Sequence, residues 1–503
     1  MKLVKSLLLG TAAGLVTVAG AQAADLPVRK AAAVEYVQLC PAFGRGFWTI
    51  PGTETCLSIS GFARGELIVA EQDNAAQDAI GWRARMRLNF DVRTATAVGP
   101  VRAYIRLDTN RSYGAGFTAG GLGSGFVGLA GVGGLGGGGA TAQGLIVDQA
   151  YVQWGGFIAG RNTSIFSPGP GGDRYFGARF DDGPNNEQFA YVFDAGGGLE
   201  IAAAIENPFN RRTNTAAFAG SVIGVGGAVP GLFAFGPNSG ALNYGGQELP
   251  DFVGRVTYKG TWGYAYVAGA VHQVNDVGVN VQGAAVGGVL PPVVTARGAA
   301  DDEIGFAVNG SVEVNLPMLS AGSLAWVWAG YADGAVSYVG YGIGGPDGGG
   351  GVRGGSFLSG PGGTAIGDLP ITDAVVVGGN TRTTEAFSVA AGFRYTFSPQ
   401  FRSNIYGSYS FVDFAAGASS VITAGAFTGA RTGFVDFEEF NIAGNLIYTP
   451  VAGLDLGVEV LYRNLDFDAN VIRTRPVAGG GFVQDVVGSD DTILGRFRVN
   501  RSF

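Results

Sequence analysis

Apolar and polar residues alternate strictly from Trp82 to Arg93: every even position is apolar and every odd position is polar. In an extended strand successive side chains point to opposite faces, so this pattern gives one apolar and one polar face, whereas a helix would mix the two sets. The segment 101–108 repeats the pattern. Because only 94–100 lies between them, we predict that the two segments form a hairpin.

About sixteen segments of this kind, each around ten residues long, follow one another along the chain. A strand of about ten residues crosses an outer membrane when it is tilted by about 45°. The predicted spans are 57–70, 80–94, 100–112, 145–154, 157–166, 188–194, 199–206, 251–259, 264–272, 303–315, 324–333, 385–397, 401–414, 434–448, 454–467 and 491–503.

The connections between these spans alternate in length. The short ones include 155–156, 195–198, 260–263, 398–400 and 449–453, and the long ones are 113–144, 207–250, 273–302 and 334–384. Outer-membrane barrels combine short periplasmic turns with longer external loops. A sheet in hydrocarbon satisfies its edge groups only by joining its last strand to its first. We therefore predict an all-β fold, a closed transmembrane antiparallel β-barrel of about sixteen strands around a water-filled interior.

The first 23 residues have the features of a secretory signal peptide, which are early lysines, an apolar stretch and the small-x-small sequence Ala21-Gln22-Ala23. This predicts 24–56 as a segment ahead of the first strand and 57–503 as the barrel. Cleavage removes two lysines and no acid, which leaves 30 basic against 40 acidic residues and a formal charge of −10. Since the basic residues are dispersed, no nucleic-acid partner is predicted. No later segment offers the roughly 20 uninterrupted apolar residues of a membrane-spanning helix.

His272 is the single histidine, and Cys40 and Cys56 are the only cysteines. A zinc site needs about four ligands, so we predict no metal and no cofactor. Hydrolytic catalysis would have to pass through His272, and adjacent loop acids such as Asp181 and Asp182 are usually solvated; we predict that the protein is not an enzyme. The two cysteines either pair in an oxidising compartment or lie as small buried hydrophobes.

Residues 35–44 read EYVQLCPAFG and residues 47–66 read FWTIPGTETCLSISGFARGE, with Ala-Asp-Leu-Pro ahead of them. This stretch resembles the amino-terminal signature of the alphaproteobacterial general porin family. The signal peptide, the first strands and the terminal phenylalanine resemble the family as well, whereas the loops of 113–384 match it only in architecture. The resemblance implies a homotrimeric, sixteen-stranded outer-membrane porin surrounded by lipid. It also implies that Phe503 is an assembly signal for the barrel-assembly machinery.

In porins of this size the third external loop folds into the lumen, and here the corresponding connection is 167–187. Its charged residues are Asp173, Arg174, Arg179, Asp181, Asp182 and Glu187. The arginines that face the lumen from the predicted hairpin wall are Arg83, Arg85, Arg87, Arg102 and Arg106. We hypothesise that loop acids and wall arginines set a transverse field at a constriction. Alternatively, the arginines pair with neighbouring carboxylates such as Asp91 and Asp108 and line a wide vestibule.

Three functional classes remain open. The first is a porin for passive diffusion of ions and small hydrophilic solutes, which the pattern favours. The second is a surface-exposed structural or adhesive barrel with a blocked lumen, and the third is a membrane hydrolase that uses His272. The glycine-rich tracts 113–144, 219–250, 279–300, 340–380 and 415–431 either form flexible external loops or plug the lumen. The sequence leaves the ion preference of the channel open.

Overall fold

The structure is a computed structural model that describes residues 38–71, 79–114, 141–142, 145–169, 171–213, 239–241, 244–246, 248–276, 279–282, 293–296, 302–341, 357–359, 365–423, 425–476 and 482–503. The chain divides into two compact units, residues 1–57 and residues 58–503. The predicted signal peptide lies outside the described residues, as do large parts of the glycine-rich tracts, so the prediction that these tracts are flexible or plug the lumen stays open.

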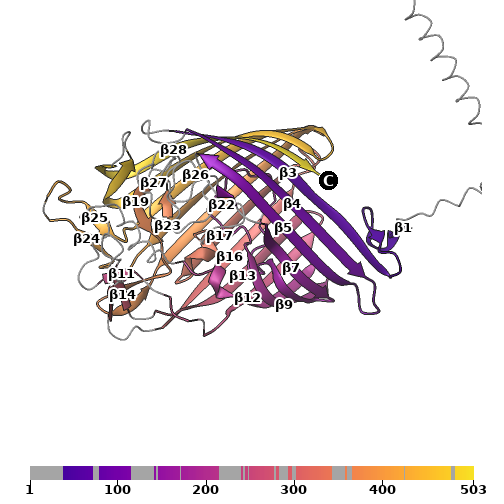
Figure 1. The fold of residues 1–503 in the computed structure, drawn as a ribbon, viewed down its shortest axis with the longest axis horizontal. Helices are drawn as coiled ribbons and strands as arrows, with labels where there is room; N and C mark the ends of the chain where they lie inside the picture. The colour runs from indigo at the N-terminus through magenta and orange to yellow at the C-terminus, as the bar shows by residue number, and fades with distance from the viewer. Residues whose placement is uncertain are drawn as a thin grey trace, which may run out of the picture. The chain divides into compact units, whose positions relative to one another are not determined.

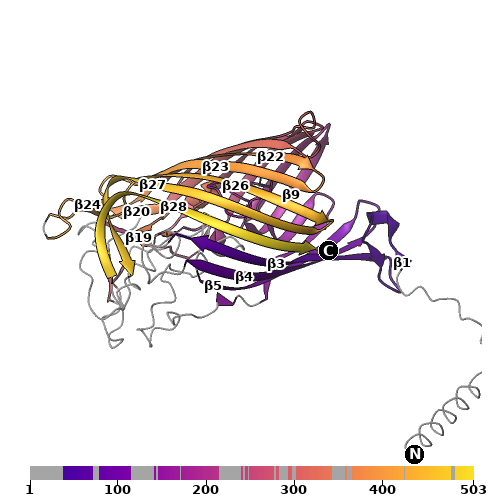
Figure 2. The ribbon, with the colours of Figure 1, turned by 90° about the horizontal axis from the view of Figure 1, so that it is seen from above.

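Sixteen long strands build the second unit, and the predicted number is confirmed (Figures 1 and 2). Their bounds differ from the predicted spans by a few residues in most cases. They are β3 (Thr55–Ala70), β4 (Ile80–Thr94), β5 (Val101–Gly114), β7 (Ile146–Trp154), β8 (Phe157–Thr163), β9 (Asn185–Gly196), β10 (Leu199–Glu206), β12 (Asp251–Gly260), β13 (Gly263–Val274), β16 (Glu303–Asn315), β17 (Leu324–Asp333), β22 (Glu385–Ser398), β23 (Phe401–Asp413), β26 (Phe437–Val451), β27 (Leu454–Pro476) and β28 (Phe482–Ser502).

The strands close into a barrel. Each long strand from β4 to β28 pairs antiparallel with the next one. Strand β28 then pairs antiparallel with β3, from Leu494 opposite Ala70 to Ser502 opposite Phe62. Closure gives the edge amides partners inside the protein, which a hydrocarbon environment requires. We call the β28–β3 pairing the seam.

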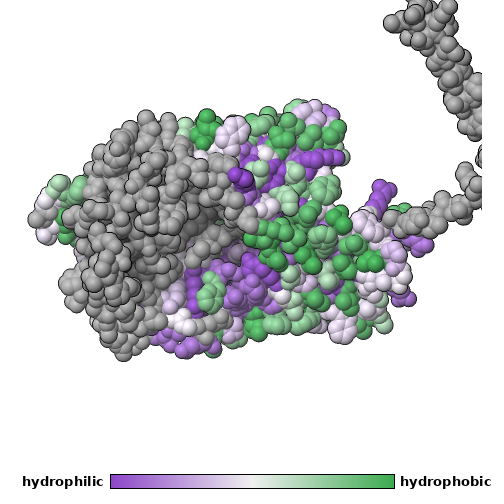
Figure 3. Space-filling model, in the orientation of Figure 1, coloured by the Kyte–Doolittle hydropathy of each residue, from purple (hydrophilic) through white to green (hydrophobic). Residues whose placement is uncertain are grey.

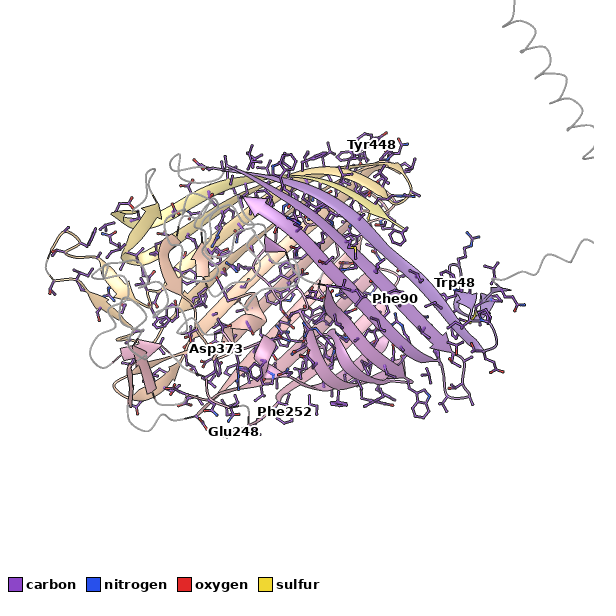
Figure 4. All side chains as sticks on the ribbon, viewed as in Figure 1. Trp48, Phe90, Glu248, Phe252, Asp373 and Tyr448 are labelled. Carbon is purple, nitrogen blue, oxygen red and sulfur yellow. A yellow bond between two sulfur atoms is a disulfide. The ribbon has the colours of Figure 1, made fainter. Side chains whose placement is uncertain are left out.

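The two faces of the sheet differ as the alternation predicts. On β4 the side chains of Trp82 and Met86 are 60% and 39% exposed, whereas those of Arg83 and Arg85 point inward and are buried. Phe90, on the outward register of the same strand, is labelled in Figure 4. Hydrophobic residues form large patches on the outer surface of the strands, on the face shown in Figure 3. The outward face therefore suits contact with lipid.

Strands β27 and β28 extend further than the predicted spans 454–467 and 491–503. Their pairing shifts register between Asp466 and Val471 and then continues to Pro476 opposite Phe482. The strict alternation of apolar and polar residues ends near Asp466 and Asp468. Beyond this point Val471 packs in the hydrophobic core and Val487 lies against it. The apolar residues there stand in adjacent pairs, Val471-Ile472 and Val486-Val487, so the search for strict alternation missed the extension.

Shorter elements lie ahead of β3 and in the connections between the long strands. They are β1 (Gln38–Leu39), η2 (Pro41–Phe43), β2 (Trp48–Thr49), β6 (Thr141–Ala142), η3 (Pro208–Asn210), β11 (Ser239–Ala241), β14 (Val279–Gln282), β15 (Val293–Ala296), η5 (Val336–Val339), β18 (Phe357–Ser359), β19 (Ala365–Pro370), β20 (Ala374–Val377), β21 (Asn380–Thr383), β24 (Ser419–Val421) and β25 (Arg431–Gly433). No helix among the described residues is both long and apolar enough to cross a membrane.

The amino-terminal unit contains the predicted disulfide. Cys40 and Cys56 are bonded, with their Cα atoms 6.1 Å apart. Both side chains are buried with Phe47 in a small cluster, against which Phe43 packs. The two readings of the cysteines are therefore both correct, since the bonded pair is also part of a small apolar core.

Candidate functional site

An arginine-rich wall lines the lumen from the seam to β7. Strand alternation and register place nine arginines and five carboxylates on the inner face of β28, β3, β4, β5 and β7, a difference of four positive charges among the described residues. The arginines are Arg64, Arg83, Arg85, Arg87, Arg93, Arg102, Arg106, Arg496 and Arg498, and the acids are Glu66, Asp91, Asp108, Asp148 and Asp490. All five arginines predicted for the positive wall belong to this set.

These arginines pair with acids of their own wall. Arg85 and Arg87 both bind Asp108, at 2.8 Å each, and Arg102 binds Asp91 at 2.9 Å. The alternative reading, in which the arginines pair with neighbouring carboxylates, therefore describes these local contacts correctly. Two acids that the sequence did not suggest complete the wall: Arg83 lies 2.5 Å from Glu66, and Arg106 lies 2.5 Å from Asp148.

A β-bulge explains the position of Asp148. In the β5–β7 pairing, Arg106 lies opposite Gln149 but Leu107 lies opposite Val147, so that Asp148 is an extra residue. A bulge breaks the alternation of side chains and re-aims one of them. Asp148 and Gln149 are consequently both buried, although they are adjacent in sequence. A strict period of two could not predict this acid on the inner wall.

The segment between β8 and β9, which is described at residues 164–169 and 171–184, lies inside the barrel along the wall opposite the arginines. The Ser167 hydroxyl contacts the Tyr266 hydroxyl of β13, and the Gly171 amide donates to Glu313 of β16. Further along, the Tyr175 amide donates to Glu459 of β27. We call residues 164–184 the inner loop. It crosses from one strand to the next around the lumen and narrows it.

The charged residues predicted for this loop separate into two groups. Glu187 lies in β9 rather than in the loop, and it pairs outside the lumen with Arg161 at 2.7 Å. The strand begins at Asn185 because its ladder with β8 starts there, so the predicted loop boundary was too late. The other five residues lie in the inner loop and contact the far wall, one another or a neighbouring segment. Asp173 binds Arg394 and Arg402, Arg174 binds Asp182, Arg179 binds Glu439 and Asp181 binds Arg211.

The loop tip reaches the seam. The backbone amides of Tyr175 and Phe176 each donate a hydrogen bond to the Glu459 carboxylate. The Tyr175 carbonyl accepts hydrogen bonds from Arg496, at 2.5 Å, and from Arg498, at 3.5 Å. The tip therefore contacts one end of the arginine wall, whereas none of the loop carboxylates is paired with the five predicted wall arginines in the described contacts.

Buried aromatic side chains hold the loop in place. Phe180 packs against Trp326 and Trp328, with ring centroids 5.6 and 6.0 Å apart, and Phe166 meets Tyr338 edge to face at 4.7 Å. Trp328 and Phe166 are fully buried. Sequence reasoning missed this cluster, although aromatic residues at inward positions of β17, where lumen-facing residues are expected to be polar, are a usable signal.

A buried polar cluster lies toward the end with the long connections, where Figure 4 labels Asp373. His272 contacts Asp251 at 2.8 Å and the Tyr244 hydroxyl at 3.1 Å. Asp373 accepts hydrogen bonds from Tyr244 and from the Thr213 and Val336 amides, and burial raises the pKa of Asp373 to about 6. The ring nitrogens of His272 thus contact acids and a phenol rather than a serine hydroxyl. No cluster of the described histidine, cysteine and acidic residues is arranged to hold a metal ion.

Phe503 lies at the seam. Its amide donates to the Gly61 carbonyl at 3.1 Å, and its carbonyl accepts from the Gly61 amide at 3.0 Å. A Cβ atom on Gly61 would lie 2.1 Å from the Arg87 carbonyl oxygen of β4, so the close approach of β4 to β3 at this position needs glycine. The Phe503 side chain is 64% exposed. The carboxyl-terminal residue therefore joins the first strand and leaves its ring accessible.

Comparison with known proteins identifies relatives. Residues 25–486 match the model of a family described as "Porin subfamily". The chain is 32% identical over 278 residues to Porin Omp2b of Brucella canis and to Porin Omp2b of Brucella abortus, an alignment of 53% of this chain and 65% of those relatives. The crystal structure of the outer membrane channel DcaP of Acinetobacter baumannii is 16% identical, with a TM-score of 0.53 over 90% of this chain and 99% of that one. This last likeness concerns the fold.

Proposed function

Because the chain belongs to the Porin subfamily, we propose that it forms a water-filled channel for passive diffusion of ions and small hydrophilic solutes. It lies in the bacterial outer membrane. The observation that carries the proposal is the inner loop, which lines one side of a closed sixteen-strand barrel and leaves a charged wall facing it. Membership of a porin family favours a channel over an enzyme.

The constriction lies between the inner loop and the arginine wall. Arg83, Arg85, Arg87, Arg102 and Arg106 supply its positive side. Asp173, Arg174, Arg179, Asp181 and Asp182 belong to the loop side. Asp173 and Arg179 set the loop position through pairs with the far wall, whereas the other three pair within the loop or with Arg211 of a neighbouring segment. Oriented charges between low-dielectric walls act strongly on passing solutes. Glu187, on the outer face, is no part of this constriction.

The partners follow from the same proposal. The apolar outer face contacts membrane lipid, and the protein assembles as a homotrimer. The carboxyl-terminal strand with the accessible ring of Phe503 is the segment presented to the barrel-assembly machinery. Small hydrophilic solutes pass through the lumen without a cofactor or a metal.

The channel is tested with purified protein in planar bilayers and in liposomes. We expect stepwise ion conductance and swelling of liposomes in small sugars, because water fills the space that the inner loop leaves. An unaltered empty bilayer and protein unfolded by boiling are the controls. Absence of both conductance and swelling, from protein that migrates as a folded barrel, would contradict the proposal.

A structural or adhesive barrel is the second candidate, and one observation favours it. The segment with η5 is buried inside the barrel, where Tyr338 and Tyr341 have no exposed surface. Inward packing of external segments is what a blocked lumen requires. Conductance without swelling would indicate a narrow ion path. The absence of both conductance and swelling would support the structural or adhesive barrel.

A further inference from the structure

Four arginines of the β4–β5 hairpin remain accessible from the lumen. The side chains of Arg87, Arg93, Arg102 and Arg106 are 21%, 28%, 24% and 19% exposed. Arg83 and Arg85, which lie on the same wall further from the short turn of the hairpin, have side chains that are 1% exposed. The accessible four extend from the middle of the β4–β5 hairpin to the rim formed by its short turn, which in an outer-membrane barrel is the periplasmic rim.

The register of the hairpin arranges these side chains in a column. Arg93 lies opposite Arg102, and the next inward pairs are Asp91–Tyr104, Asn89–Arg106 and Arg87–Asp108. Inward pairs are two residues apart, so successive levels are separated by about 7 Å along the strands. Three of these four levels carry at least one guanidinium. A solute moving along the wall meets a cation at nearly every level.

Two carboxylates, the partly exposed Asp91 and the buried Asp148, are each shared by two of these arginines. Asp91 accepts from both Arg93 and Arg102, which each place a two-nitrogen fork on it at 2.7–3.0 Å. Asp148 accepts from Arg87 and Arg106. Arg87 also binds Asp108, which Arg85 shares. Sharing orients the guanidinium groups and leaves one net positive charge on each group, namely two arginines with Asp91 below, and three arginines with Asp108 and Asp148 above. The planar fork of each guanidinium matches carboxylate and phosphate oxygens.

Aromatic rings fix the lowest level of the column. The Arg102 guanidinium lies 4.8 Å from the Tyr104 ring centroid and 5.5 Å from that of Tyr151. Stacking on aromatic faces keeps a guanidinium plane in one orientation. A preoriented cation loses less entropy when it binds an anion. The lowest level is therefore suited to bind an anion in a defined position, in addition to attracting it.

We propose that Arg87, Arg93, Arg102 and Arg106 form an oxyanion track, which binds small solutes bearing a carboxylate or phosphate group and makes the channel prefer anions over cations. The inference deepens the proposed function and rests on it. The formal charge of −10 expected for the exported chain opposes such a preference. Exposed charges act over a Debye length of about 8 Å, and the cations of the track lie within that distance of a solute on this wall.

The test removes the two lowest cations, in the variant Arg93→Gln with Arg102→Gln. The matched control is Arg255→Gln with Lys259→Gln on β12, because that pair also shares one acid, Glu200, on the opposite wall. We measure the reversal potential across a salt gradient, and the loss of chloride current as inorganic phosphate or acetate is added. Migration as a folded barrel on gels establishes that each variant is assembled.

We expect the wild type to favour anions. Its chloride current should fall to a plateau as phosphate or acetate is added. The track variant should bind the blocking anion about tenfold more weakly, as expected for the loss of charge-assisted hydrogen bonds worth about 1.4 kcal/mol. The control should keep most of the wild-type affinity. A cation-selective wild type, no block by either anion, or equal block of wild type and track variant overturns the track while conduction stands. A folded wild type that does not conduct overturns the proposed function and the track together.

Discussion

At the scale of single residues, several ionisable side chains are buried away from water, and Asp373 is one of them. Three donors, from Thr213, Tyr244 and Val336, surround its carboxylate, yet burial dominates and raises the pKa of Asp373 from its ordinary value of 3.8 to about 6. Between these two values the folded protein holds a proton that the unfolded chain has released. The segments around Asp373 should therefore be more stable in weak acid.

The expected result is a contribution of up to about 3 kcal/mol to the free energy of unfolding. This contribution is present in full below about pH 4 and is lost as the pH rises through about 6. Asp373→Asn removes the titration, so its stability should change less over the same interval. Protease cleavage of the external segments and thermal melting, each followed across this interval, measure the effect. Asp194→Asn, an exposed acid at the end of β9, is the control. A variant with the pH profile of the wild type would contradict the assignment.

Residue positions were predictable where they follow from alternation alone. The inward arginines of β4 and β5 are correct because each strand keeps its period of two. The partners of these arginines were not predictable. Asp148 reaches the wall through a bulge, and Glu66 belongs to a strand whose pairing with the chain end no local pattern reveals.

At the level of elements, the inner loop depends on space left for it by a glycine. A Cβ atom on Gly457 would lie 1.9 Å from the Tyr175 hydroxyl oxygen. The position faces the lumen on β27, between Asp455 and Glu459. Glycine there allows the loop tip to lie flat against the wall.

Replacing Gly457 with alanine should push Tyr175 away from β27 and into the open part of the lumen. Overpacking of this kind costs about 1–3 kcal/mol, which is enough to shift the position of a docked loop. We expect a lower single-channel conductance from a barrel of normal heat resistance. Gly65→Ala, where an added Cβ meets nothing within 4 Å, is the control. Equal conductance of the two variants would contradict the proposed role of the tip.

The long strands themselves were predictable from the sequence, because lipid on one side and water on the other impose the same period on each of them. The path of the inner loop was not. Its contacts join residues that are hundreds of positions apart, as Tyr175 and Glu459 are. The aromatic side chains on β17 also break the rule of polar lumen positions, since they pack against Phe180 rather than face water.

For the whole molecule, the decisive feature is the seam, where one carboxylate binds cations from the two neighbouring strands. Glu66 of β3 lies 2.5 Å from Arg83 of β4 and 2.7 Å from Arg498 of β28, with Arg496 at 3.6 Å. All four side chains are almost fully buried. Removing the negative charge would leave the cations to repel one another at the closure of the ring.

Glu66→Gln should therefore destabilise the closed barrel by about 3–5 kcal/mol, the usual cost of breaking a buried ion pair. The measurement is the temperature at which the compact gel band converts to the unfolded one. Glu187→Gln, which removes a half-exposed partner of Arg161 on the outer face, should cost less than about 1 kcal/mol. Similar shifts for the two variants would show that the seam cluster is not critical to closure.

The reach of the inner loop also implies an order of events. Its tip binds Glu459 of β27 and Arg496 of β28, the last two long strands of the chain, so the docking site of the tip is incomplete until these strands have joined the barrel. A newly closed cylinder should accordingly begin as a wide-bore intermediate, and the aperture is trimmed to its final calibre only when the tip settles. Maturation of the conduit would then be visible as a slow decline in leak after insertion.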